Sequence, residues 1–240
     1  MRFFTFSWLI LIVAVHVTIP APVEATPRRS GGVLVVDFGL PRFGEDAMRT
    51  RTLIQVLRPG IAARVLHYRQ VTPQRLAREN PRAVVIVAPP ASLRRYPTEA
   101  LSALESAVRG FRGPLLAIGT GCHLLVHAWE GHVGPIETEE PFSGTHDVLL
   151  IQRDPLFEGL PKKFAAVFQS HDEIQDVPEE FVRLAVTEGD RVVGLRHSRR
   201  DHYGVQFHPE APLGARLPAR QVLCNFLAIA GYPPSTPQAR

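Results

Sequence analysis

The chain has 240 residues, of which 45% are hydrophobic and 21% charged, and this composition excludes general disorder and fits one full-sized globular domain. The net charge of +4 permits contact with nucleic acid, but the longest basic cluster, at 196–200, has no aromatic residues interleaved, so we interpret it as a solvated loop and expect no nucleic-acid partner. The two cysteines are too few for a disulfide scaffold, and no CxxC pair supports a zinc finger.

Residues 1–29 are typical of an export segment followed by a linker. Arg2 precedes an almost wholly apolar run at 3–19, and small residues follow as in a secretory signal cleaved after Ala25. The run is also at the lower limit for a membrane span. Three alternatives stay open: a cleaved signal (periplasmic or secreted protein), an uncleaved N-terminal anchor, and a mis-assigned start near Gly31, which implies a cytoplasmic protein.

Residues 30–233 form the predicted domain, and 234–240 a short tail. Continuous apolar runs, expected where a parallel sheet is covered on both faces, predict strands at 33–37, 63–68, 83–87 and 114–118. Helical spacing predicts helices at 47–57, 72–79 (capped by Thr72), 98–109 (capped by Thr98), 122–129 and 218–230. The second half is richer in strands, predicted at 147–152, 165–169, 182–187, 192–196 and 203–207. The alternation predicts a three-layer α/β fold with a central, mostly parallel sheet.

The fourth strand turns into a helix at Gly119, and we call this turn the elbow. Ligands of open α/β sheets bind beyond the carboxyl ends of the strands. A residue at such a turn is exposed at a helix N-terminus, which favours an anion and lowers the pKa of a thiol. The elbow is therefore the first candidate for a functional site.

Two segments here resemble the class I glutamine amidotransferases. Residues 117–127 read A-I-G-T-G-C-H-L-L-V-H against the family's G-I-C-L-G-H-Q-L-L-A-H, and G-H-V-G-P at 131–135 fixes the register without gaps. Residues 203–210 read Y-G-V-Q-F-H-P-E, letter for letter the family's second motif. The resemblance, strongest to the GMP synthase type, covers 33–231. It implies a flavodoxin-like fold and hydrolysis of glutamine to supply ammonia to a partner synthetase.

The resemblance also assigns site residues. It makes His208 the general base and Glu210 the residue that orients it, two positions apart on one face of a strand end. It places the nucleophilic cysteine at Gly119, where a glycine removes covalent catalysis. The family's oxyanion loop, S-G-G-P-x-S, reads V-A-P-P-A-S at 87–92, and Pro89 has no backbone N–H to donate. Both departures predict a degenerate site that binds a small amide, an amino acid or a partner protein.

Other interpretations of the site stay open, so whether the chain is an enzyme is left undecided. Cys122, about 5 Å beyond the elbow along the helix, is a weak alternative nucleophile for an active amidase. A hydrolase using His208 with water or a metal is another alternative. His123, His171, His208 and Glu210 could approach one another, but their spacing does not require a metal, so we expect neither metal nor cofactor. The candidate ligand-binding residues are Pro89, Thr120, His123 and His171.

Overall fold

The computed structural model describes residues 31–40, 44–137, 142–211 and 218–233. The predicted export segment and the tail lie outside these residues, so an exported or membrane-anchored location stays a prediction. Within the described ranges, none of the helices combines the length and the apolar character that a membrane crossing needs.

Strands and helices alternate along the first half of the chain, and strands dominate the second half. The helices are α1 (Glu45–Leu57), α2 (Pro73–Glu79), α3 (Thr98–Gly110), α4 (Thr120–His127) and α5 (Arg220–Ile229). The strands are β1 (Val33–Asp37), β2 (Ala63–His67), β3 (Ala83–Ala88), β4 (Leu115–Gly119), β5 (His132–Pro135), β6 (Phe142–Leu150), β7 (Lys163–Ser170), β8 (Asp172–Asp176), β9 (Phe181–Val186), β10 (Val192–His197) and β11 (His202–Val205). Short 3₁₀ turns lie at Tyr68–Gln70, Leu93–Arg95 and Pro155–Phe157.

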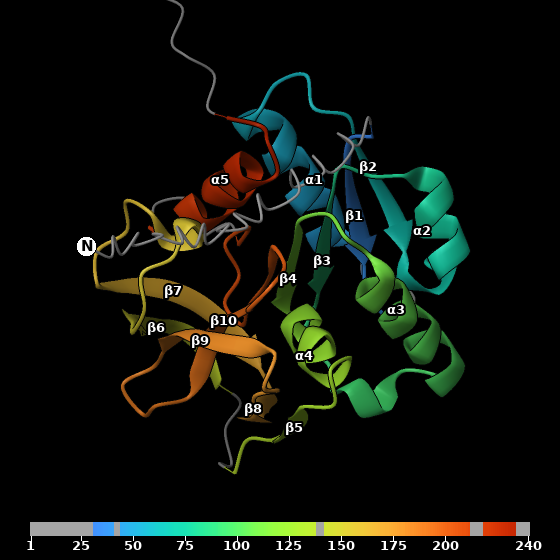
Figure 1. Ribbon diagram of the computed structural model, residues 1–240. Helices are drawn as coiled ribbons and strands as arrows, with labels where there is room; N and C mark the ends of the chain where they lie inside the picture. The colour runs from blue at the N-terminus through green and yellow to red at the C-terminus, as the bar shows by residue number, and fades with distance from the viewer. Residues whose placement is uncertain (1–30, 41–43, 138–141, 212–217, 234–240) are drawn as a thin grey trace, which may run out of the picture.

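A nine-stranded sheet forms the centre of the molecule, in the order β2-β1-β3-β4-β11-β10-β9-β6-β7 (Figure 1). The strands from β2 to β11 pair in parallel, and those from β11 to β7 pair antiparallel. The predicted α/β fold is confirmed. The parallel half carries the elbow, and its order is that of a flavodoxin-like sheet.

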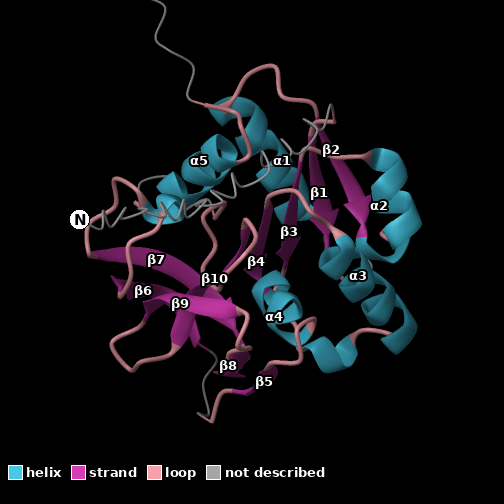
Figure 2. Ribbon diagram, in the orientation of Figure 1, coloured by secondary structure: helices cyan, strands magenta, loops and turns pink. Residues whose placement is uncertain are grey.

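Both faces of the parallel half are covered by helices (Figure 2). Alternate side chains of β3 enter different cores: Val85 packs in the core with α1 and α5, whereas Val84 and Ile86 pack in the core with α2, α3 and α4. Side chains of a strand alternate between the two faces, so a strand that is buried on both must be apolar throughout. This explains why the first strands read as continuous apolar runs.

Some local predictions were confirmed and others were wrong. The Thr72 hydroxyl accepts a hydrogen bond from the Arg75 N–H (3.1 Å) at the start of α2, as predicted. Thr98 is the first residue of α3 and does not cap it, because Pro97 takes the N-cap position. The ribbon of β5 and β8 was missed, since both strands are short and one contains a Gly-Pro pair.

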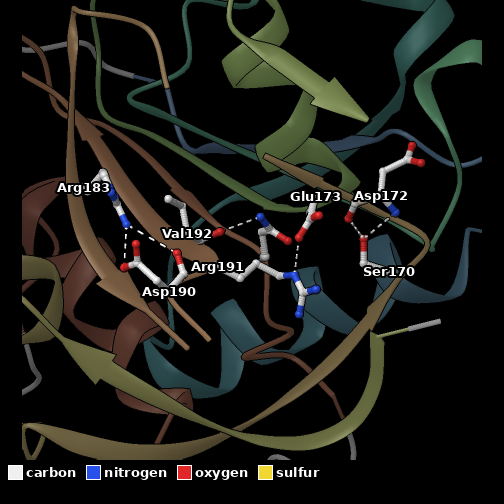
Figure 3. Close-up of polar contacts among 8 residues, drawn as sticks. Ser170, Asp172, Glu173, Arg183, Asp190, Arg191 and Val192 are labelled. Atoms are coloured by element: carbon white, nitrogen blue, oxygen red, sulfur yellow. Dashed lines mark hydrogen bonds and ion pairs between the residues drawn. The ribbon is translucent and has the colours of Figure 1, made fainter. Parts of the chain in front are cut away.

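Side-chain contacts reinforce the region around β8 and the β9–β10 hairpin (Figure 3). Arg191, just before β10, donates from Nε to the Glu173 carboxylate of β8 at 2.5 Å. Arg183 and Asp190 pair across the hairpin at 2.8 Å. Ser170 donates from its hydroxyl to the Asp172 carbonyl at 2.6 Å. The S-H-D-E segment at 170–173 therefore fastens the small ribbon to the large sheet.

Candidate functional site

The elbow joins β4 to α4 without an intervening loop. Gly119 ends the strand with φ 60° and ψ −127°, and Thr120 begins the helix. L-residues seldom adopt this conformation, so glycine holds it at the lowest cost. A Cβ on residue 119 would lie 2.7 Å from Cε1 and 3.0 Å from Nε2 of His208, and 3.2 Å from the Ala88 carbonyl oxygen. The His208 ring therefore lies in the space that a side chain on this residue would need.

His208 and Glu210 form a buried hydrogen-bonded pair. The distance from Nδ1 of His208 to Oε1 of Glu210 is 2.7 Å, and the two residues are 7% and 3% exposed. The pair lies beyond the end of β11, so the expected strand geometry was wrong. The contact comes from a turn in which the Ala211 N–H donates to the His208 carbonyl (3.2 Å), and the His208 N–H donates to Val167 of β7 (2.8 Å).

The charge state of His208 follows from its neighbours. Burial lowers the pKa of His208, but the charge of Glu210, its hydrogen bond and the charge of Asp46 together outweigh this, and the pKa is raised above its usual value. Nε2 has no hydrogen-bond partner among the described residues and lies against Gly119. The free ring nitrogen therefore faces the elbow.

The loop after β3 is fastened to the elbow by the Thr120 hydroxyl. Its oxygen lies 3.1 Å from the Pro89 carbonyl and 3.2 Å from the Ala91 carbonyl, and it accepts from the Ala91 N–H at 3.2 Å. Thr120 is thus a buried clamp between two segments. Pro89 is half-buried beside it, so the structure brings these two predicted ligand-binding residues together at the elbow.

Comparison with known proteins identifies this arrangement. The family described as glutamine amidotransferase class-I matches residues 46–227. The chain belongs to the class I glutamine amidotransferase family. It is 31% identical over 179 residues to a glutamine-hydrolysing GMP synthase from Thermosipho melanesiensis. The matched region is 74% of this chain and 32% of that protein. It is 35% identical over 118 residues to one subunit of a glutamine-hydrolysing GMP synthase from Methanopyrus kandleri, covering 49% and 62%.

The chain therefore spans about a third of the length of the full GMP synthase that it matches. Among solved structures it resembles a provisionally assigned GMP synthase subunit from Thermoplasma acidophilum, with TM-score 0.71 and 21% identity over 84% of this chain and 94% of that one. It also resembles a glutamine amidotransferase from Thermotoga maritima, with TM-score 0.59 and 15% identity over 82% and 81%. The sequence relatives confirm the predicted family and its GMP synthase-like branch, and the structures confirm the fold.

Two α4 residues of this amidotransferase domain, Cys122 and His123, are buried inside the domain. Cys122 is fully buried, and its Sγ lies 2.7 Å from where a Cβ on Gly204 of β11 would be. Burial raises the pKa of this thiol, so little thiolate forms. Burial also lowers the pKa of His123 to about 4, against the opposing effects of Gln206 and Asp172, so His123 is neutral at pH 7.

The histidines considered as metal ligands do not converge. His123 is buried inside the domain, whereas His171 is exposed between β7 and β8. Within 31–40, 44–137, 142–211 and 218–233, no three His, Cys, Asp or Glu side chains are grouped as a metal would require. His171 takes part in the fold through its backbone, since its carbonyl accepts from the Ile136 N–H at 3.0 Å.

The sequence reasoning missed Asp46, in the first turn of α1. Burial raises the pKa of its carboxyl group, and the charge of Glu210 raises it further, while His208 and Arg49 oppose the shift. Arg49 pairs with Asp46 at 2.9 Å. Acidic residues are common in a first helical turn, so no local signal connects Asp46 to a motif more than 160 positions later.

Proposed function

We propose that this chain is a glutamine amidotransferase domain that does not hydrolyse glutamine and that acts by binding a small amide or amino acid, or a partner protein. The observation that carries the proposal is the position of the His208 ring, which fills the space that a side chain on residue 119 would need. The elbow thus has no nucleophilic atom, and one can enter only if His208 shifts.

The loop beside the elbow supports the same conclusion. Pro89 cannot donate a backbone N–H, and its carbonyl oxygen already lies within hydrogen-bond distance of Thr120. Losing a single oxyanion donor costs about 100- to 1000-fold in rate. The missing thiol and the missing donor lie in separate segments and affect the same reaction.

A protein partner is part of the proposal because several relatives are named as one subunit of a GMP synthase, which designates one chain of an assembly. Small-ligand binding is separable from partner binding. A rise in the Tm of the full chain with glutamine, glutamate or asparagine, absent in Thr120→Val, would support a small ligand at the elbow. If no amide or amino acid raises the Tm, the small-ligand half of the proposal fails.

The decisive experiment measures ammonia release from glutamine by the full chain. We expect no release above the buffer rate from the parent. Gly119→Cys should restore slow release, and adding His208→Ala to that variant should abolish it, because the imidazole would serve as the base for the new thiol. Robust release by the parent that disappears in Cys122→Ser would overturn the proposal.

One observation favours a second candidate, a hydrolase that uses His208 to activate water. Nε2 is buried and has no partner among the described residues, and the pKa of His208 is raised above its usual value. Turnover of an amide or ester by the parent that is lost in His208→Ala and kept in Cys122→Ser would favour this candidate.

A further inference from the structure

A hollow lies at the end of the sheet opposite the elbow. His202 begins β11 and pairs with Leu115 at the start of β4, whereas Gly119 ends β4 at the other edge. The lining comes from the α3–β4 connection, the residues after α4, the β8–β9 connection and the β10–β11 turn. We call this site the basic hollow and define it by Arg112, Trp129, His197, Arg199 and Arg200.

The basic hollow has an aromatic base. Trp129 contacts His197 edge-on, with ring centroids 5.4 Å apart, and contacts Phe181 in the same way at 5.4 Å. The Arg200 guanidinium lies 5.7 Å from the centre of the Trp129 ring, a cation–π distance. The edge-to-face contacts fix the Trp129 ring, and this ring supports the Arg200 guanidinium above it.

Carboxylates line the basic hollow too, but none of them forms an ion pair with Arg112, Arg199 or Arg200 within the described residues. Within the described residues, the guanidinium groups of Arg112 and Arg199 form no ion pair or hydrogen bond. Arg200 donates one hydrogen bond, to the Arg109 carbonyl at 2.7 Å. Arg196 differs, because it pairs with Asp154 at 3.3 Å.

The same groups repel one another. Burial and the charge of Arg112 lower the pKa of Arg200. Burial, Arg200 and Arg199 lower the pKa of His197, and Glu180 only partly opposes this. Like charges that are held near one another are stabilised by an anion placed between them.

We propose that the basic hollow binds a small phosphate monoester that also carries hydroxyl groups. Guanidinium groups are planar forks of N–H donors that match phosphate oxygens, and Arg112, Arg199 and Arg200 all line this hollow. Glu179, Glu180 and Asp201 line the rim of the same hollow and can accept hydrogen bonds from hydroxyl groups of the ligand. These carboxylates also repel a long polyanion, which favours a small ligand. The proposal does not depend on the elbow or on the proposed function.

The test is calorimetric titration of the full chain with ribose 5-phosphate as the probe, with ribose and inorganic phosphate as comparisons. We expect ribose 5-phosphate to bind most tightly, inorganic phosphate more weakly, and ribose not at all. The Arg112→Gln/Arg199→Gln variant should weaken binding at least about tenfold, since it removes two charge-assisted donors. Because these side chains hold no other part of the described chain, the variant should unfold at the parent's denaturant midpoint.

The control variant is Arg94→Gln/Arg95→Gln, which removes two exposed charges from a 3₁₀ turn that does not line the hollow and should leave binding unchanged. A local readout comes from Trp129 fluorescence in a Trp8→Phe background, which should change on titration with the probe. No binding by the parent, equal weakening in both double variants, or binding without a change at Trp129 would each overturn the proposal.

Discussion

The elbow and the loop after β11 face each other across the candidate site, and they have departed from the family's pattern to different extents. The loop keeps the His208–Glu210 pair, buried and hydrogen-bonded at 2.7 Å. The elbow is a sharp turn with φ 60° at Gly119, but it has no side chain there. The shape of such a turn therefore does not require its nucleophile, because glycine adopts the conformation more readily than cysteine does.

The largest effect should come from the loop. His208→Ala leaves the buried carboxylate of Glu210 without its partner, and we expect a loss of about 3–5 kcal/mol in unfolding free energy. Denaturant titration measures this loss. The matched control is His127→Ala, whose pairing with Glu105 at 2.6 Å involves a side chain that is 50% exposed and should contribute less than about 1 kcal/mol. Equal losses in the two variants would contradict the assignment of a buried charged pair.

The stability that the His208–Glu210 pair contributes should depend on pH. The pKa of His208 is raised in the folded chain, so its stabilisation is complete below the unfolded pKa near 6.5 and is lost as the pH rises through the folded value. Urea titrations at increasing pH measure this loss, and substituting Glu210→Gln should remove it.

The contribution of His123 in α4 to stability should depend on pH in the opposite direction. The folded pKa of His123 is about 4, below its ordinary 6.5, so the unfolded chain takes up the proton first as the pH falls. Between pH 6.5 and 4, we expect the unfolding free energy of the parent to fall by up to about 3 kcal/mol more than that of His123→Leu. Urea titrations across this range measure the difference, with His132→Leu at an exposed site as the control. Parallel curves for parent and His123→Leu would refute the buried, neutral state.

Gly119→Ala tests whether the elbow is a conformational glycine. The positive φ and the contact with the His208 ring should together cost about 1–3 kcal/mol in unfolding free energy. Gly110→Ala is the matched control, since a Cβ there meets nothing within 4 Å, and it should be neutral or stabilising. An elbow variant as stable as the parent would mean that the turn accepts a side chain and that His208 moves freely.

The smallest expected effect is at the clamp between the elbow and the β3 loop. Thr120→Val leaves the Ala91 N–H and two carbonyl oxygens without the hydroxyl, and we expect a loss of about 1–2 kcal/mol. Thr52→Val is the control, because the Thr52 hydroxyl only contacts its own helix at an exposed position. The β3 loop should also exchange its amide hydrogens faster in Thr120→Val. Unchanged exchange at Ala91 would show that the clamp does not hold the loop.

Part of the site could be foreseen from the sequence. The Y-G-V-Q-F-H-P-E motif indicated the His208–Glu210 pair, and the contact exists although its strand geometry was wrong. The electrostatic interaction of Asp46 with the His208–Glu210 pair was not foreseen, and neither was the basic hollow. Both depend on segments that lie far apart in the chain. His171 was expected to be a structural or pocket residue because it lies in a motif; its side chain is exposed, and a role in ligand binding stays a prediction.

Local sequence patterns were enough to predict the layered α/β fold, because strands covered on both faces must be apolar throughout and the helices between them amphipathic. Two sequence motifs, which are visible in the sequence without knowledge of the structure, were enough to predict the family. The directions of the side chains came from the folded contacts alone. Cys122 faces β11, Nε2 of His208 faces the elbow, and three arginines from two separate connections line one hollow at the opposite edge. Contacts across the sheet bring together residues that are far apart in the sequence. These contacts determine the charge, the reactivity and the solvent exposure of the side chains.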